Sequence, residues 1–314
     1  MPSAPPDAAV ERFRTDLTAL TGPDVGRLGL AVSGGPDSLA LLLLSHAAGF
    51  ECTAATVDHN LRVEGADEAR FVEGVCYDLT VPHTTLQLGT LGKGNLSDRA
   101  RDARYAALTE WGEANGIAFL VTAHHADDQL ETMLMRLNRS AGVGGLAGIR
   151  ARRGQIVRPL LTWRKAELEE LVQSCGVTAR KDPSNQDDHF DRARLRKSLQ
   201  GASWLNPVAA SRSAAALSEA EDALDWTAKA YENQRVGEND KALSFDPNDL
   251  PPELVRRIIL ACLRRIVPTT APRGDALDRL MIALANGQTT TLSGVKCTGG
   301  PIWRFTPAPP RRTV

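Results

Sequence analysis

The feature that most constrains the fold is a short polar turn between two apolar runs, residues 28–32 and 39–44. This order is typical of a strand, a tight turn and a helix. The residues of the turn are Ser33, Gly34, Gly35, Pro36, Asp37 and Ser38. Two glycines let the backbone turn sharply and leave room for a ligand. The free N–H groups that begin the helix, together with the two serine hydroxyls, therefore predict a cradle for an anion, most simply a phosphate.

This turn is neither of the two common phosphate loops. It lacks the Gly-Lys-Ser/Thr ending of the Walker loop, and it lacks the spacing of the dinucleotide fingerprint. A carboxylate such as Asp37 in the first helical turn repels a phosphate unless a cation lies between them. We therefore infer a Mg²⁺ ion that bridges Asp37 and the phosphates. The competing interpretation is an ordinary turn in which Asp37 caps the helix.

Strands and helices are predicted to alternate over the first half of the chain, which indicates an α/β domain with a parallel sheet and helices on both faces. The predicted strands are 28–32, 52–57, 83–88, 117–123 and 156–161. The predicted helices after the turn are 66–79, 96–115, 127–139 and 163–175, the last capped by Thr162 and the second by Asn95 or Ser97. Residues 142–147 are read as a glycine-rich loop. Ligands of such sheets bind beyond the carboxyl ends of strands, so the turn, Asp58-His59-Asn60 and residues 124–128 are expected at one edge.

The alternation stops after residue 206. Helices are predicted over 208–231, 252–266 and 276–285, and short strands over 289–292, 295–298 and 302–305. We expect a loose N-terminus with a first helix in residues 1–20, the α/β domain in residues 21–203, and a smaller, mainly helical C-terminal domain in residues 204–314.

Composition narrows the class of protein only moderately. The net charge of −1 does not by itself indicate a nucleic-acid partner. Residues 150–200, however, carry 12 Lys and Arg against 7 Asp and Glu. That segment is either a phosphate-contacting face or an ordinary solvated surface. The five cysteines include no C-x-x-C pair, so neither a zinc site nor a disulfide framework is indicated. No apolar run suits a membrane span and no signal pattern opens the chain, so we expect a cytoplasmic protein.

Five motifs in a fixed order carry a resemblance to one family. The turn resembles the S-G-G-x-D-S loop of the N-type ATP pyrophosphatases, which split ATP into AMP and pyrophosphate. The other four motifs are A-R-x-x-R-Y at residues 100–105, T-A-H-H-x-D-D-x-x-E-T at 122–132, R-P-L-L at 158–161, and D-P-S-N at 182–185 followed by R-A-R-L-R at 192–196. Together they resemble the tRNA(Ile)-lysidine synthetases over residues 28–199, a little over half of the chain.

The resemblance implies a PP-loop ATPase fold and a reaction. Enzymes of this family use ATP to adenylate the C2 oxygen of the wobble cytidine in the CAU anticodon of an isoleucine tRNA. An amine of free L-lysine then attacks C2 and expels AMP, which leaves lysidine. The implied cofactors are ATP and Mg²⁺, and the implied partners are tRNA(Ile) and L-lysine.

The residues suit this chemistry, although each also has an ordinary interpretation. Asp128 and Glu131 share one helix face and can hold an ammonium group, and the resemblance makes them the lysine-binding acids. Asp37 and Arg101 are the further catalytic candidates. Arg101, together with Arg104, can hold phosphate oxygens or stabilise developing negative charge, or can pair on the helix surface with Asp98 and Asp102.

Two further groups of residues are open to the same two interpretations. His125 either contacts ATP or the cytidine, or is a packed histidine. The three arginines of the last motif either meet tRNA phosphates or are ordinary surface charges; they are Arg192, Arg194 and Arg196.

Three rival functions share parts of this pattern. A tRNA thiolase on the same scaffold would also adenylate a base, but it needs reactive cysteines or an iron–sulfur cluster. A metal-dependent phosphoesterase would use Asp58, His59 and the residues from His124 to Asp128. A nucleotide sensor would explain the turn but not the acid pair.

Overall fold

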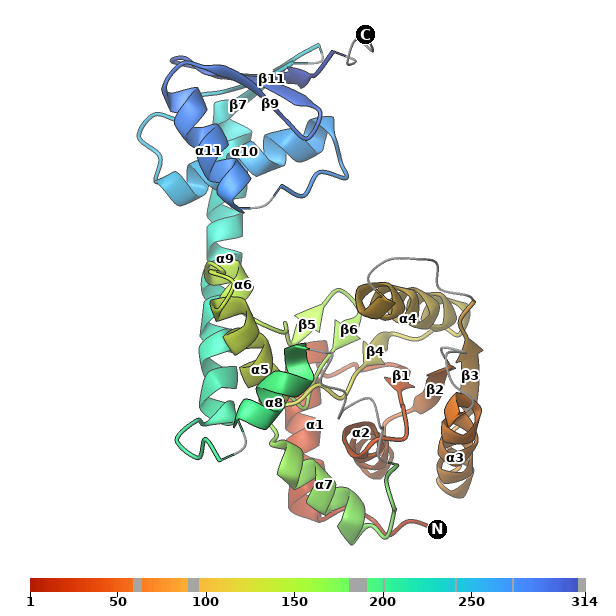
Figure 1. Ribbon diagram of the computed structural model, residues 1–314. Coiled ribbons are helices and arrows are strands. Elements are labelled where there is room, and N and C mark those ends of the chain that lie inside the picture. Colours follow the sequence, from red (N-terminus) through yellow and green to blue (C-terminus); the bar gives the residue numbers. More distant parts are fainter. Residues whose placement is uncertain are drawn as a thin grey trace. The chain divides into compact units, whose positions relative to one another are not determined.

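The computed structural model describes residues 1–58, 64–89, 96–180, 191–199, 201–240, 242–272 and 274–309 (Figure 1). They form two compact units, residues 1–218 and 219–314. No helix among these residues is both long and apolar enough to cross a bilayer. The predicted D-P-S-N motif, His59, Asn60 and Asn95 lie outside the described residues.

The first unit is built on a six-stranded sheet with the strand order β3-β2-β1-β4-β6-β5. The strands are β1 (Leu28–Ala31), β2 (Cys52–Asp58), β3 (His83–Gln87), β4 (Phe119–Val121), β5 (Arg152–Arg153) and β6 (Ile156–Val157). All neighbours are parallel except β5 and β6, which pair antiparallel at one edge. The chain winds outward from β1 to β3 and then begins again at β4 on the other side of β1. This reversal between β1 and β4 is the place where α/β sheets bind ligands.

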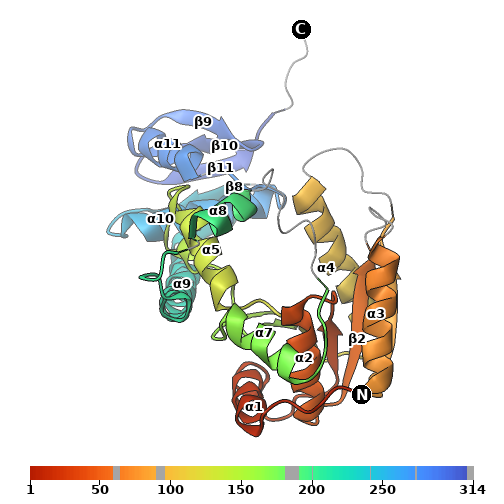
Figure 2. The ribbon, with the colours of Figure 1, turned by 60° about the horizontal axis from the view of Figure 1, so that its bottom comes forward.

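Helices cover both faces of this sheet, as predicted. The larger core includes residues of α1 (Asp7–Thr21), α2 (Pro36–Ala47), α3 (Glu64–Asp78) and α7 (Lys165–Ser174). Figure 2 shows α1, α2 and α7 lying side by side. A smaller core lies against α4 (Leu96–Ala114). The apolar run after the turn is fully enclosed, because every residue from Leu39 to Leu44 is buried.

Strand β1 alternates between the two cores. Leu28 and Leu30 belong to the larger core, and Ala31 belongs to the smaller one. Gly29 lies against the indole of Trp111 on α4, where a Cβ atom would come within 2.7 Å of the ring. A side chain at residue 29 would therefore push α4 away from the sheet.

The structure differs from the predicted elements at several points. The glycine-rich segment contains a one-turn helix, α6 (Val143–Leu146), and the predicted strands 117–123 and 156–161 are reduced to β4 and β6. Arg164, instead of Thr162, precedes α7 as its N-cap, and its N–H donates to Glu167 at 2.7 Å. Near the N-terminus, the Ser3 N–H donates to the Cys175 carbonyl at 2.9 Å, and the predicted loose N-terminus stays a prediction.

The second unit pairs helices with a five-stranded antiparallel sheet. Helix α9 (Pro207–Arg235) begins in the first unit and ends in the second. The strand order is β7-β8-β11-β10-β9. The elements after α9 are β7 (Val236–Asn239), β8 (Ala242–Phe245), α10 (Pro252–Ile266), α11 (Gly274–Ala285), β9 (Thr289–Leu292), β10 (Val295–Thr298) and β11 (Trp303–Pro307). The predicted helices and terminal strands are therefore confirmed.

Strands β7 and β8 were not predicted. The sequence of β7, Val-Gly-Glu-Asn, has low strand propensity and no apolar alternation, so only pairing with β8 makes it a strand. The core of this unit includes Phe245 and Trp303, whose rings meet edge to face with centroids 6.0 Å apart. The predicted domain boundary at residues 203–204 precedes α9, whereas the compact units divide within that helix after Ser218. Where the folding unit ends stays a prediction.

Candidate active site

The polar turn closes onto itself through its serines. The Ser33 N–H donates to Ser38 Oγ at 3.1 Å, and the Ser38 hydroxyl donates to the Gly35 carbonyl at 3.0 Å. Gly34 has a φ of +79°, and its carbonyl accepts a hydrogen bond from the Arg180 N–H at 3.1 Å. This positive φ explains why glycine stands there, since other residues rarely adopt it. The turn is thus held in one conformation by residues outside it as well as within it.

Helix α2 begins from this turn without a side-chain cap. Its N-cap is Gly35, with Pro36 in the first turn, and no side chain of the described residues accepts a capping hydrogen bond there. The alternative in which Asp37 caps the helix is therefore wrong. The first-turn N–H groups at the positive end of the helix dipole remain available to an anion, as the phosphate-loop interpretation requires.

Asp37 lies close to the start of the helix that follows β4, the neighbour of β1 in the sheet. Its Oδ2 lies 3.5 Å from His125 Nε2. Its Oδ1 is buried and has no hydrogen-bond partner among the described residues. A buried carboxylate oxygen without a partner is unfavourable by roughly 1–3 kcal/mol. Asp37 is therefore suited to a cation that arrives with a ligand.

His125 joins the end of β4 to helix α5 (Ala126–Leu137). It is the N-cap of α5: its Nδ1 accepts from the Asp128 N–H and its own N–H donates to Asp128 Oδ2, both at 3.3 Å. The side chain is 2% exposed. Burial alone lowers the pKa of His125, but the hydrogen bond with Asp37 and the charges of Asp128 and Asp127 outweigh it, so its pKa lies above the ordinary value. His125 is packed in this structure and brings Asp37 and Asp128 together, and its contact with ATP or the cytidine stays a prediction.

Its neighbour His124 has a different environment. His124 Nδ1 lies 3.0 Å from Thr122 Oγ1. Burial lowers the pKa of His124 to about 3, opposed by Asp128 and assisted by Arg158, Arg104 and Arg101. His124 is therefore neutral at physiological pH, and these arginines lie near enough to affect it.

Asp128 and Glu131 lie on one face of α5, as their spacing predicted. Both contact the same guanidinium: Arg196 Nε lies 2.5 Å from Glu131 Oε1, and Arg196 Nη2 lies 3.3 Å from Asp128 Oδ1. Glu131 is 5% exposed. Burial raises the pKa of Asp128, but the neighbouring histidines and Arg192 outweigh this and hold it below its ordinary value. The two acids therefore form one buried anionic site beside His125.

Asp127, the acid next to Asp128, has a different task. Its Oδ2 accepts a hydrogen bond from the Lys165 N–H at 2.8 Å, and its Oδ1 lies 3.4 Å from Arg164 Nη2. It thus fastens the start of α7 to the start of α5. The sequence motif predicted a binding role for Asp128 and none for Asp127.

Basic side chains of α4 and of the R-P-L-L motif gather on the same side of the sheet. The Arg101 guanidinium lies 5.3 Å from the centre of the Tyr105 ring. Arg158 is 5% exposed; its Nη1 donates to the Arg150 carbonyl at 2.8 Å and its Nη2 to Tyr105 Oη at 3.4 Å. Burial and the charge of Arg101 lower the pKa of Arg104, which Tyr105 opposes. No ion pair joins Arg101 or Arg104 to Asp102 within the described part of the chain, and the Asp98 side chain lies outside it. No role was predicted for Arg158 from the sequence, although the R-P-L-L motif that contains it was recognised; Arg158 lies directly after β6.

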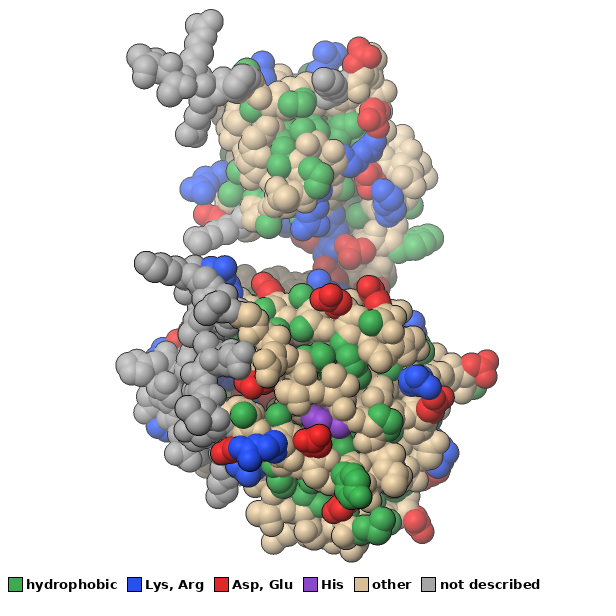
Figure 3. Space-filling view, turned by 90° about the vertical axis from the view of Figure 1, so that its right-hand side faces the viewer, with side chains coloured by type: hydrophobic (Ala, Val, Ile, Leu, Met, Phe, Trp, Pro, Cys, Tyr) green, Lys and Arg blue, Asp and Glu red, His purple; other side chains and the backbone are tan. Residues whose placement is uncertain are grey.

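The three arginines of the last motif lie on α8 (Asp191–Leu199) and separate into two kinds. Arg192 and Arg196 turn toward the acids of α5, whereas Arg194 is exposed and pairs with Asp191. Part of the basic surplus of residues 150–200 is thus used inside the unit, as are the inward contacts of Arg158 and Arg164. Acidic and basic side chains are interspersed on the described part of the face in Figure 3. Contacts with tRNA by these arginines stay a prediction.

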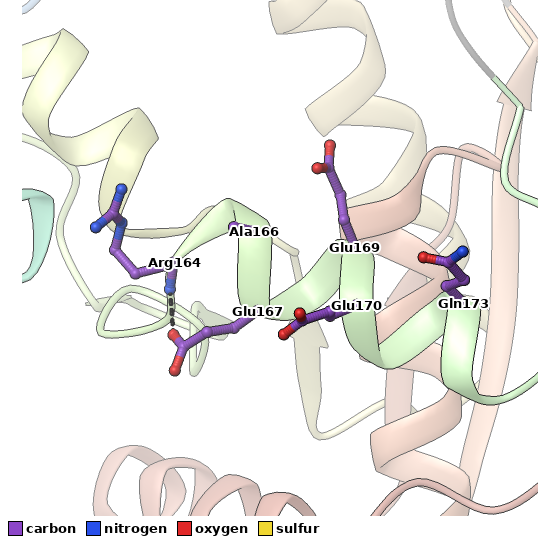
Figure 4. A pocket seen from close by; sticks show the side chains of 6 residues that line it. All are labelled: Arg164, Ala166, Glu167, Glu169, Glu170 and Gln173. Atoms are coloured by element: carbon purple, nitrogen blue, oxygen red, sulfur yellow. Dashed lines mark hydrogen bonds between the residues drawn. The ribbon is translucent and has the colours of Figure 1, made fainter. Parts of the chain in front are cut away.

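A hollow of about 390 Å³ lies along α7. Figure 4 shows its lining, which comes from one helix and the residue before it: Arg164, Ala166, Glu167, Glu169, Glu170 and Gln173. Three glutamates repel phosphates, so this hollow does not suit a nucleotide.

The structure gives little support to the residues that the rival functions would require. Burial raises the pKa of the Cys52 thiol to about 11 and, with Cys52 and Glu73 adding to it, that of Cys76 to about 12, so neither is a reactive thiolate. Asp58 is buried at the end of β2, close to Gly65 of α3. The remaining residues of the phosphoesterase alternative, His59 and Asn60, are not among those described.

Known proteins resemble this chain in sequence and in fold. A U34-tRNA thiolase from Methanococcus maripaludis superposes with a TM-score of 0.55 at 15% identity, covering 67% of this chain and 79% of that one, which shows a shared fold alone. Residues 10–202 match the PP-loop domain family. Proteins named tRNA(Ile)-lysidine synthase are 40% identical in Zymomonas mobilis, over 93% of this chain and 92% of the relative, and 42% identical in Novosphingobium aromaticivorans, over 97% and 95%. The chain therefore belongs to the tRNA(Ile)-lysidine synthases of the PP-loop family.

Proposed function

We propose that this enzyme uses ATP to join L-lysine to C2 of the wobble cytidine in the CAU anticodon of tRNA(Ile), with AMP and pyrophosphate as the other products. The names of its relatives support ATP-dependent lysidine formation on tRNA(Ile). The observation that carries the residue assignment is the junction at His125, which joins Asp37 of the phosphate loop to the acid pair of α5. Such a junction suits a reaction in which a phosphate and an amine must meet at one base.

The first half-reaction depends on the phosphate loop. The C2 oxygen of the cytidine attacks the α-phosphorus of ATP, and the bond to pyrophosphate breaks. The N–H groups that begin α2 and the hydroxyl of Ser33 bind phosphate oxygens, since helix starts attract anions. Mg²⁺ held by Asp37 and the phosphates would neutralise charge on the leaving group, and the unpartnered Oδ1 of Asp37 fits such an ion.

The second half-reaction depends on α5 and α4. Asp128 and Glu131 bind an ammonium group of L-lysine and orient its attacking amine toward C2. The amine forms the new C–N bond, releases a proton to solvent, and displaces AMP, which takes the electron pair of the broken C–O bond. Arg101 faces the developing negative charge, supported by Arg104.

The function is tested by mass analysis of the anticodon nucleosides. The enzyme is incubated with ATP, Mg²⁺, isotopically labelled L-lysine and an unmodified tRNA(Ile) transcript. We expect one labelled lysine per tRNA, located at the wobble cytidine and accompanied by stoichiometric AMP. A methionine tRNA transcript, which carries the same anticodon, is the matched control and is expected to stay unmodified.

Two results would replace this function by a rival. Incorporation of sulfur from sulfide instead of lysine would indicate a thiolase, and phosphoester hydrolysis with Mn²⁺ but without ATP would indicate a phosphoesterase. We also propose that the enzyme acts on tRNA in the cytoplasm.

A further inference from the structure

The site assigned to the substrate ammonium is already filled by cations of the chain itself. Arg196 contacts both acids through Nε and Nη2, at 2.5 Å from Glu131 and 3.3 Å from Asp128. Arg192 Nε lies 3.1 Å from Glu131 Oε2, and its Nη2 donates to Thr132 Oγ1 at 2.7 Å. Both arginines come from α8, more than sixty positions later in the chain than the acids.

This pairing leaves one acid oxygen incompletely satisfied. Glu131 Oε2 and Arg192 Nε are close enough for an ion pair, yet both atoms are buried and neither makes a hydrogen bond with any described residue. An ammonium group has three donors that can rotate, so it can satisfy an oxygen that a planar guanidinium does not reach in the correct direction. The acid site therefore accepts the internal cation without being fully complementary to it.

Both arginine side chains are partly exposed to solvent, so they can move away from the acids. The side chains of Arg196 and Arg192 are 30% and 36% exposed, in contrast to 6% for Glu131. The charge of Arg192, after burial and Arg101, also lowers the pKa of Arg136, which shows that cations crowd this region. Arg194 and Lys197 are exposed on the same helix. A phosphate backbone approaching α8 would thus attract four basic side chains, two of which now bind the acids.

We propose that Arg196, assisted by Arg192, is an internal competitor of the substrate amine, and that RNA phosphates draw these arginines away from Asp128 and Glu131. The inference rests on the proposed function, in which these acids bind L-lysine. Its consequence is that L-lysine binds more tightly when tRNA is present, so the amine site opens only on an enzyme that carries its acceptor. By linkage, L-lysine strengthens the binding of tRNA by the same factor.

The test measures the dissociation constant of L-lysine by calorimetry on the full chain, with a non-hydrolysable ATP analogue and with or without tRNA(Ile). For the unaltered enzyme we expect tRNA to tighten L-lysine binding by about 5- to 150-fold, the usual range of coupling between sites. Arg196→Gln removes the competing charge, so it is expected to bind L-lysine tightly without tRNA and to show little further gain with it. Arg196→Lys keeps a cation and is expected to retain most of the coupling.

Arg14→Gln is the matched control, because Arg14 lies on α1, where it pairs with Glu11 at 3.4 Å and lies 6.0 Å from the centre of the Phe50 ring, and it contacts neither acid of α5. It should behave like the unaltered enzyme, and thermal unfolding of each variant shows whether α8 still packs. Weaker L-lysine binding by a folded Arg196→Gln protein would overturn the inference and make Arg196 a positioning residue for the acids. Equal binding with and without tRNA, in an enzyme that still forms lysidine, would overturn the inference alone. No L-lysine binding under any condition would overturn the proposed lysine site as well.

Discussion

Two adjacent acids, Asp127 and Asp128, should respond to the same substitution in different ways. Asp127→Ala removes the acceptor of the Lys165 N–H at 2.8 Å and an ion pair with Arg164. A hydrogen bond to a charged acceptor contributes about 1.5–3 kcal/mol, and the half-exposed Arg164 adds little. The free energy of unfolding of the first unit should therefore fall by about 2 kcal/mol, which corresponds to a Tm lower by roughly 4–8 °C.

Asp128→Ala removes a charge that we assign to the substrate. Losing one charge-assisted hydrogen bond of about 1.5–3 kcal/mol weakens binding by about 10- to 150-fold. We expect KM for L-lysine to rise by that factor while KM for ATP changes little. Some stability is lost too, because Asp128 completes the reciprocal cap with His125.

The assay combines thermal unfolding with lysine and ATP kinetics, measured well below the lower Tm. Asp127→Ala is expected to show a lower Tm and a normal KM for L-lysine. The reasoning is refuted if Asp127→Ala raises KM for L-lysine as much as Asp128→Ala does, or if it leaves Tm unchanged.

Two further predictions concern the turn and a buried histidine. Gly34→Ala places a Cβ at a φ of +79°, 3.4 Å from Val72 Cγ2, so strain of about 1–2 kcal/mol should weaken ATP binding about 5- to 30-fold; a normal affinity by calorimetry would contradict this. His124 has a pKa of about 3 in the folded protein, below its unfolded value of about 6.5, so the unfolded state binds more protons between these values and stability should fall as the pH decreases from about 6.5 toward 3. Denaturant unfolding of His124→Asn should show a weaker pH dependence across that window, and an unchanged pH dependence would count against the burial argument.

The features that the sequence predicted well are local ones. The polar turn between apolar runs is recognisable because each residue serves its own backbone position: Gly34 supplies a positive φ, and Pro36 suits the first turn of a helix. The apolar runs also predicted buried elements correctly, because the residues of β1 and most residues of α2 are buried. The parallel sheet then follows from general rules of chain connection. For these reasons the sequence was sufficient to predict the fold class and the edge of the sheet at which the candidate site lies.

Tertiary structure alone decided which partner each charged side chain has. Asp127 and Asp128 are chemically identical neighbours, yet one faces the start of α7 and the other faces α8. Arg196 reads as a surface charge in the sequence, and its contact with Glu131 depends on two helices meeting across 65 positions of chain. Strand β7 exists only because β8 pairs with it. An ion pair or a strand pairing depends on the distance between segments that no local pattern encodes, so the contents of the acid site became visible only once the chain was folded.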